Sequence, residues 1–296
     1  MGLPAKARLR EVGPRDGLQG EAAVAPEGRA RLVDALAAAG LREIEAVSFV
    51  SPTAVPAMAG AADVLAGVSR RPDVRLIALV PNRRGAELAV EAGIDGLSVT
   101  VSASPAYNER NVRMTIEQSV DAVGEICAIV GDLPVDAVVS CAFGSPYEGD
   151  IASDDVASLG DRLLDAGATS LTYADTTGMA TPRRIDDLVD VVGTDVGLHL
   201  HDARGTALVN AYAALVRGVA RFDSSIGGLG GSPFATDAAG NLATEDFVAM
   251  LDDLGVETGV DLTRLLEASA VAADLVTHPL ASRVAAVGPR DRRASD

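Results

Sequence analysis

The stretch VGLHLHDARGTALVNAYAALVRGVARFDSSI, residues 196–226, contains one complete unit of the pattern that decides the fold. Its two ends, 196–201 and 221–226, are short runs with the apolar pattern expected of strands. Between them, residues 207–219 have apolar side chains spaced three and four positions apart, which predicts a helix. A strand, a helix and a second strand of these lengths form a β-α-β unit with parallel strands and a right-handed crossover.

The same alternation extends over the rest of the chain. Six more strand-like runs occur at 8–12, 43–49, 74–80, 96–101, 135–142 and 170–174, and further helical periods occur at 27–39, 115–130, 154–166 and 183–192. Eight units predict an α/β fold of the closed (β/α)8 TIM-barrel class, with the barrel at about 8–228 and a glycine-rich loop with one or two additional helices at about 228–285. No linker composition divides the chain, so we expect a single domain over 1–296.

The main alternative is a doubly wound open sheet. That fold usually has a glycine-rich phosphate-binding turn after its first strand. Here the corresponding segment is GPRDGLQGE at 13–21, which places two charged residues where a pyrophosphate would need bare backbone. The closed barrel is therefore favoured.

Composition excludes several classes of function. The 296 residues include 42 acidic and 25 basic side chains, and the net charge of −17 argues against a nucleic-acid partner. Lys6 is the only lysine, so a lysine imine mechanism is disfavoured. Two cysteines, Cys127 and Cys141, cannot form a disulfide framework or a cysteine-rich zinc site. Neither a signal peptide nor a long apolar span is evident, so we expect a cytoplasmic protein without a membrane partner.

Polar residues gather after the strand-like runs, where a β/α barrel carries its active site. They are Arg15 and Asp16 after the first run, Glu45 and Ser48 in the second, Ser145 and Glu148 after the fifth, Asp175, Thr176 and Thr177 after the sixth, His199, His201 and Asp202 at the seventh, and GLGGSPFATDAAGN at 228–241 after the eighth. This distribution predicts a polar mouth at one end of the barrel.

His199 and His201 carry the most chemistry. At positions i and i+2 of a strand, both imidazoles point to one face, and with a carboxylate they can hold a divalent cation. The alternative is a pair of core or surface histidines. Asp16 is the best carboxylate partner, since Gly17 permits a tight turn beside it; the alternative role is a helix or turn cap. Asn241 is either a turn residue or a fourth ligand. Such a donor set favours Mg²⁺ or Mn²⁺.

Arg15, next to Asp16, offers a planar fork of donors to an oxyanion or carboxylate, or is a solvated surface residue. The segment at 227–241 has five glycines in fifteen residues, which is typical of a mobile active-site loop or of a simple connection.

Six motifs identify a family resemblance. They are EVGPRDGLQGE at 11–21, SFVSP at 48–52, SCAFGSPYEG at 140–149, ADTTG at 174–178, HLHD at 199–202 and GLGGSPFATDAAGNLATED at 228–246. In this order they resemble the 3-hydroxy-3-methylglutaryl-CoA lyase family, metal-dependent barrel lyases related to isopropylmalate and homocitrate synthases. The similarity extends from about residue 8 to about residue 270.

The resemblance implies retro-Claisen cleavage of 3-hydroxy-3-methylglutaryl-CoA, an acyl-CoA substrate, to acetoacetate and acetyl-CoA, as in leucine degradation, by a protein that we expect to be a homodimer. It also implies site roles. The metal ligands are Asp16, His199, His201 and Asn241, with Mg²⁺ or Mn²⁺ as the cofactor; Arg15 stabilises the enolate; Glu45 and Asp175 handle protons and orient the substrate; and we assign substrate contacts to Gln19, Ser48, Asn111 and Thr176.

Three positions depart from the family pattern. Ser232 stands at the position of the catalytic cysteine of the family's GLGGCP loop, and a serine hydroxyl is a far weaker acid than a thiol. Ser145 replaces another cysteine, and Ala203 removes a hydroxyl. We therefore expect a large loss of rate on the family's substrate. Two alternatives stay open: a paralogous lyase or aldolase for another 3-hydroxyacyl-CoA or hydroxy acid, and an inactive barrel that only binds an acyl-CoA or a partner protein.

Overall fold

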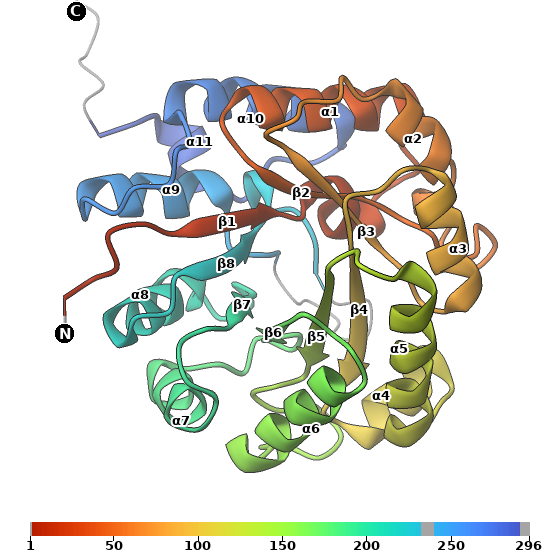
Figure 1. Ribbon diagram of the computed structural model, residues 1–296. Helices are drawn as coiled ribbons and strands as arrows, with labels where there is room; N and C mark the ends of the chain where they lie inside the picture. The colour runs from red at the N-terminus through yellow and green to blue at the C-terminus, as the bar shows by residue number, and fades with distance from the viewer. Residues whose placement is uncertain (1, 232–239, 291–296) are drawn as a thin grey trace, which may run out of the picture.

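The strands pair in sequence order, and the last strand closes onto the first (Figure 1). The computed structural model describes residues 2–231 and 240–290. All strand pairs are parallel, and the strands are β1 (Arg8–Glu11), β2 (Glu43–Ser48), β3 (Arg75–Leu79), β4 (Gly96–Ser102), β5 (Val135–Ser140), β6 (Ser170–Ala174), β7 (Gly197–His199) and β8 (Arg221–Ser224). The predicted (β/α)8 TIM barrel is confirmed.

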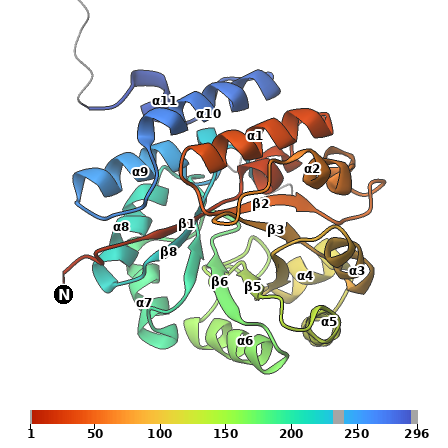
Figure 2. The same ribbon diagram turned by 45° about the horizontal axis from the view of Figure 1, so that its top comes forward.

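Helices surround the strands on all sides (Figure 2). They are α1 (Pro26–Ala38), α2 (Ala61–Gly67), α3 (Arg83–Glu91), α4 (Pro105–Val112), α5 (Ile116–Val130), α6 (Ser153–Asp165), α7 (Pro182–Val192) and α8 (Ala207–Arg217), with a short 3-10 helix η2 (Pro56–Met58) before α2. Local chemistry fixes their starts: α1, α4 and α7 begin at a proline, whose fixed φ suits the first helical position. The Thr115 side chain accepts from the backbone N–H of Gln118 in a capping box before α5.

After the barrel, the described residues form three further helices: α9 (Thr244–Asp253), α10 (Leu262–Leu275) and α11 (Arg283–Val287). α10 lies beside α1, and α9 packs against α11 (Figures 1 and 2). The sequence predicted one or two helices here; α11 has only five residues, too few for a periodic pattern. None of the described helices combines the length and apolar character needed to cross a membrane.

The connection after β1 differs from the predicted tight turn. It is a single π-helical turn, η1 (Gly13–Gly17), and Gly17 is absent from the residues with positive φ. A Cβ at Gly17 would lie 2.9 Å from Ser225 Oγ and 3.0 Å from Leu229 Cβ. Glycine is therefore required here for close packing against the segment after β8, and not for its backbone freedom.

β7 and β8 are shorter than predicted, because the chain leaves the barrel ladder early. His201 instead forms an isolated antiparallel bridge with Asn241, and the segment after β8 becomes a 3-10 turn, η3 (Ile226–Gly228). The bridge holds the end of the glycine-rich segment against the end of β7.

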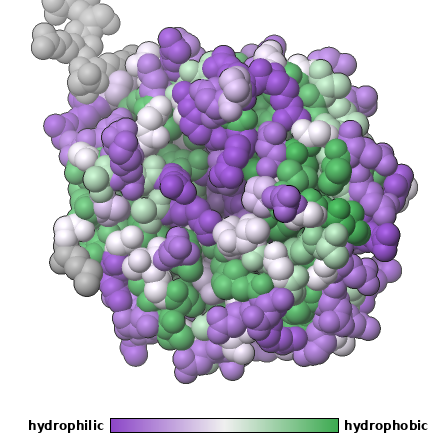
Figure 3. All heavy atoms as spheres, in the orientation of Figure 1, coloured by the Kyte–Doolittle hydropathy of each residue, from purple (hydrophilic) through white to green (hydrophobic). Residues whose placement is uncertain are grey.

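The barrel interior is unusually polar for a β/α barrel, whose inner layers are usually branched apolar side chains. Apolar residues fill the space between strands and helices, whereas buried polar side chains from the strands include Arg10, Glu45, Ser98, Asp136, Thr172 and Asp223. Figure 3 shows hydrophilic side chains around a hollow near the middle of one face. Buried charges must be paired, and this requirement organises the interior.

Glu11, at the end of β1, is fully buried and joins three segments at one end of the barrel. Its carboxylate accepts hydrogen bonds from the backbone N–H groups of Gly13 (2.8 Å) and Ile226 (2.7 Å) and from the Thr244 hydroxyl (2.6 Å). Burial raises the pKa of Glu11 to about 8, against the opposing effect of these hydrogen bonds.

Replacing Glu11 by glutamine is expected to reduce the loss of stability at rising pH. The pKa of Glu11 is higher in the folded protein than the unfolded value of 4.5. Its contribution to the free energy of unfolding is therefore fully present below pH 4.5 and is lost as the pH approaches about 8. Relative to Glu11→Gln, the wild type should lose up to about 1.4 kcal/mol of unfolding free energy per pH unit in that window. Urea unfolding of both proteins at pH 5 and pH 8 checks this. An unchanged difference between them at the two pH values would contradict it.

Candidate metal centre and active site

Asp16, His199 and His201 form a cluster in which one potential ligand atom of each lies within 4.8 Å of the others. Asp16 comes from η1, His199 ends β7, and His201 lies in the bridge two residues later. The two Nε2 atoms are 3.0 Å apart, and His199 Nε2 is 3.9 Å from Asp16 Oδ2. Adjacent ligands of an octahedral cation bound at about 2.1 Å lie about 3.0 Å apart, so the spacing of the histidines fits such an ion.

Asn241 completes this cluster. Its Nδ2 donates to Asp16 Oδ2 (2.7 Å) and to the Leu229 carbonyl (2.9 Å), while its buried Oδ1 has no hydrogen-bond partner among the described residues. A buried amide oxygen without a partner is costly unless a ligand uses it, and oxygen suits a hard divalent cation. Gly230, with φ of +110°, permits this approach, since a Cβ there would lie 2.4 Å from Asn241 Nδ2.

The protonation of His201 and Asp16 suits ligation. Burial, assisted by His199, lowers the pKa of His201 to about 4, so its imidazole is neutral near pH 7. Burial also opposes charge on His199, but the hydrogen bond and charge of Asp223 outweigh it and raise the pKa of His199. Burial likewise opposes ionisation of Asp16, yet Arg15 and the histidines lower the pKa of this carboxyl. The cluster therefore offers an ionised carboxylate.

Arg15 is not a solvated surface residue. Its side chain is only 11% exposed, its Nη1 donates to Asp16 Oδ1 at 2.8 Å, and its Nε donates to Glu45 Oε1. Glu45 Oε2 accepts from the Ser98 hydroxyl. Two carboxylates thus hold the guanidinium beside the metal-ligand candidates, where it can stabilise a developing oxyanion.

Asp175 follows β6 at the same end of the barrel. Its backbone N–H donates to the His199 carbonyl (2.8 Å), and its Oδ1 accepts from the Ala180 N–H (2.9 Å). Its Oδ2 is buried and has no partner in the described part of the chain. Burial raises the pKa of Asp175 to about 7, so this carboxyl can gain or lose a proton near neutral pH.

The other predicted site residues are less closely associated with this cluster. Ser48 is buried with its Oγ unpaired among the described residues, and Thr176 Oγ1 accepts from the Cys141 N–H at 2.9 Å. Gln19 is half-buried and Asn111 is exposed on α4; within residues 2–231 and 240–290, no hydrogen bond joins either to the cluster. Ser232 lies outside the described residues.

Two buried residues at this site were missed by the sequence reasoning. Asp223 Oδ2 lies 3.1 Å from His199 Nδ1, and Arg10 donates to both oxygens of Asp223. The available signal was a charged residue inside each of two strand-like runs, RLREV at 8–12 and RFDSSI at 221–226. Arg10 and Asp223 both face the barrel interior, where they pair with each other.

Comparison with known proteins identifies the family. The chain matches the family model described as HMGL-like over residues 6–272. It is 42% identical over 276 residues to the 3-hydroxy-3-isohexenylglutaryl-CoA/hydroxymethylglutaryl-CoA lyase of Pseudomonas aeruginosa, which covers 90% of this chain and 92% of that protein. This chain belongs to the HMGL-like family.

Solved structures place this HMGL-like protein among HMG-CoA lyases. The Bacillus subtilis HMG-CoA lyase is 39% identical, with a TM-score of 0.94 over 97% of this chain and 99% of that one. An HMG-CoA lyase from Acinetobacter baumannii, in complex with coenzyme A and 3-methylmalate, is 37% identical, with a TM-score of 0.93 over 99% and 98%. The family resemblance inferred from the six motifs is confirmed, and with it the class of carbon–carbon lyases.

Proposed function

We propose that this HMGL-like protein cleaves 3-hydroxy-3-methylglutaryl-CoA into acetoacetate and acetyl-CoA, with Mg²⁺ or Mn²⁺ held by Asp16, His199, His201 and Asn241. The observation that carries the proposal is the convergence of these four side chains with Arg15 at one end of the barrel. The choice of substrate is supported by a relative named for this thioester, to which this chain is 42% identical over most of its length.

The reaction removes the proton of the C3 hydroxyl, breaks the C2–C3 bond and leaves the electron pair on C2 as a thioester enolate. When bound, the cation supplies Lewis-acid polarisation of the oxygens that it contacts. Asp175 accepts the hydroxyl proton at Oδ2, which has no other partner among the described residues. Arg15 stabilises the enolate oxygen and Glu45 holds Arg15. Ser232 relays to C2 a proton that it takes from water, and Asp175 returns the hydroxyl proton to solvent.

Purified protein with Mg²⁺ or Mn²⁺ is expected to release acetyl-CoA from this thioester, and Ser232→Cys is expected to increase the rate. A positioned acid–base group contributes roughly 10²- to 10⁴-fold to catalysis, and a thiol can be tuned towards neutral pKa far more readily than a hydroxyl. We therefore expect kcat of Ser232→Cys to rise at least about tenfold, measured by acetyl-CoA formation.

The matched control is Cys127→Ser, since Cys127 lies on α5 on the outer side of the barrel. If the wild type has metal demonstrably bound and still forms no product, 3-hydroxy-3-methylglutaryl-CoA is excluded as its substrate. An unchanged kcat in Ser232→Cys would exclude a proton-relay role for this position.

A second substrate class is favoured by one comparison. The Pseudomonas aeruginosa relative is named for a thioester with an isohexenyl group as well as for the methyl substrate. We propose 3-hydroxy-3-alkylglutaryl-CoA thioesters with longer C3 substituents as the alternative. A panel of such thioesters separates the two: higher kcat/KM for a longer substituent favours the alternative, and cleavage of none favours a barrel that only binds.

The remaining sequence predictions belong to this proposal. We propose substrate contacts by Gln19, Ser48, Asn111 and Thr176, a homodimer, a cytoplasmic location and a place in leucine degradation. Sedimentation of the purified protein tests the dimer.

A further inference from the structure

The barrel register places three charged or ionisable residues side by side inside one layer. His199 of β7 is the Cα partner of Asp223 in β8, and Asp223 is the Cα partner of Arg10 in β1. All three side chains are buried, with at most 8% of each residue exposed. This row links a candidate metal ligand to the interior of the barrel and not to solvent.

The contacts along this row are directional. His199 Nδ1 lies 3.1 Å from Asp223 Oδ2, whereas its Nε2 faces His201 Nε2 at 3.0 Å. A carboxylate can only accept a hydrogen bond. In a neutral His199 ring, the N–H that contacts Asp223 must therefore be on Nδ1. The lone pair is then on Nε2, the atom that belongs to the metal-ligand cluster. Metal-ligating histidines commonly have this arrangement, in which a carboxylate fixes both tautomer and ring orientation.

Arg10 in turn fixes Asp223. Its Nε donates to Asp223 Oδ1 (2.8 Å) and its Nη2 to Oδ2 (2.7 Å), a bidentate pairing that sets the plane of the carboxylate. Its Nη1 donates to Asp136 Oδ2 at 2.8 Å on β5, on the other side of the barrel. Asp136 also accepts from Thr172 (2.7 Å). The arginine is thereby held between two carboxylates.

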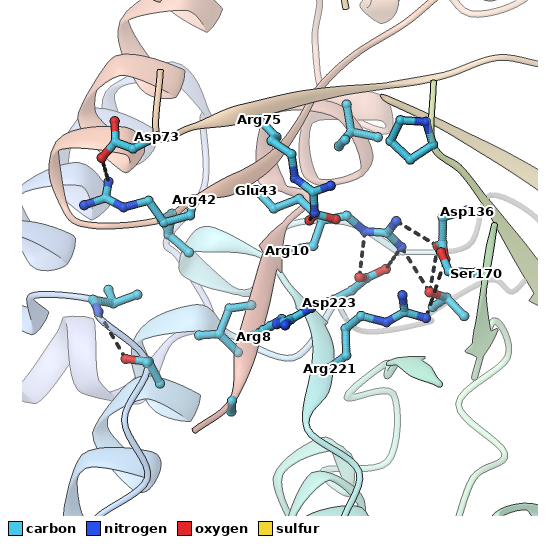
Figure 4. A pocket seen from close by; sticks show the side chains of 18 of the residues that line it. Arg8, Arg10, Arg42, Glu43, Asp73, Arg75, Asp136, Ser170, Arg221 and Asp223 are labelled. Atoms are coloured by element: carbon cyan, nitrogen blue, oxygen red, sulfur yellow. Dashed lines mark hydrogen bonds and ion pairs between the residues drawn. The ribbon is translucent and has the colours of Figure 1, made fainter. Parts of the chain in front are cut away.

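Figure 4 shows this pairing at the edge of a cavity of about 620 Å³. Several residues that line the cavity, among them Arg8, Glu43 and Arg75, lie at the starts of strands, the opposite end from η1 and the His201 bridge. The Arg10–Asp223 pair thus lies between this cavity and the metal-ligand cluster.

We infer that Asp223 is a positioning residue for the metal centre, which orients His199 so that Nε2 is presented to the cation, and that Arg10 orients Asp223. This inference rests on the divalent-cation site proposed above. It distinguishes two carboxylates that pair with the same arginine: Asp223 contacts the ligand histidine, whereas no hydrogen bond or ion pair among the described residues joins Asp136 to His199.

The test compares Asp223→Asn with the matched control Asp136→Asn by titration of each protein with Mn²⁺ alone, using calorimetry. Loss of a carboxylate behind a ligand histidine typically weakens metal binding by about 10- to 100-fold, and we expect this for Asp223→Asn. Asp136→Asn removes a charge from the same buried network without touching His199. The Mn²⁺ affinity of this variant should therefore differ from that of the wild type by less than about threefold. Equal affinities of the two variants would overturn the inference.

A second measurement uses the unaltered protein. Nitrogen-15 NMR of labelled histidines without metal, at a pH high enough for His199 to be neutral, should show its single ring proton on Nδ1, assigned by comparison with His199→Gln. A proton on Nε2 would overturn the inference even if Asp223→Asn does not fold. Absence of Mn²⁺ binding by the wild type would count against the metal proposal, while the tautomer would still decide the role of Asp223.

Discussion

Arg15→Met is expected to reduce kcat for thioester cleavage by roughly 10³-fold or more, because the variant lacks a charged donor for the enolate oxygen. Asp16 and Glu45 fix the Arg15 guanidinium beside the metal-ligand candidates. No other side chain among the described residues shares this position. Arg15→Lys keeps the charge but lacks the planar fork of donors, so its kcat should lie between those of the wild type and Arg15→Met. Steady-state acetyl-CoA formation at saturating Mn²⁺ measures the effect.

Stability must be separated from catalysis in this experiment. Removing Arg15 leaves Glu45, whose side chain is 1% exposed, without its buried cation, a change that typically costs about 3–5 kcal/mol. The double variant Arg15→Met/Glu45→Gln should recover much of the unfolding free energy and none of the activity. Arg290→Met alters an exposed arginine paired with Asp253 and is the control. Recovery of activity in the double variant would assign Arg15 a purely structural role.

His201→Ala is expected to abolish detectable Mn²⁺ binding and to lower kcat/KM by at least about 10³-fold. A ligand contributes directly to cation affinity, and a catalytic cation supplies several kcal/mol of transition-state stabilisation. Calorimetric titration and acetyl-CoA release measure the two effects. The removal of metal by a chelator should reproduce the loss in the wild type.

The chain has three histidines, and the third provides the control. His278 is exposed, and its Nε2 lies 2.9 Å from Glu21. His278→Ala should bind Mn²⁺ as the wild type does. Wild-type affinity in His201→Ala would remove this residue from the proposed ligand set.

The sequence predicted the barrel because each unit carries its own local signal. A strand-like run such as 170–174 matches β6 in full, and the position of Asp16 after β1 follows from the chain order of the barrel. The structure brings Arg15, which follows β1, into contact with Asp16 and with Glu45 of β2.

What the sequence could not predict depends on pairing between distant segments. The bridge between His201 and Asn241 joins residues that no local pattern relates, and it explains why β7 ends at His199. Arg10 and Asp223 were overlooked because a charge in a strand has meaning only once its cross-barrel partner is known. The sequence predicts Gly17 in a tight turn, because its packing against Leu229 involves a segment distant in the chain.

The bridge between His201 and Asn241 also has an entropic consequence. The Leu242 N–H donates to the Leu200 carbonyl and the Asp202 N–H donates to the Gly240 carbonyl, each at 2.9 Å, so the backbone on either side of two ligand candidates is already fixed. Ordering one backbone residue costs roughly 1–2 kcal/mol, and here that cost belongs to folding of the barrel and not to capture of the ion. Weakening this short ladder would therefore reduce cation affinity even with every ligand side chain intact.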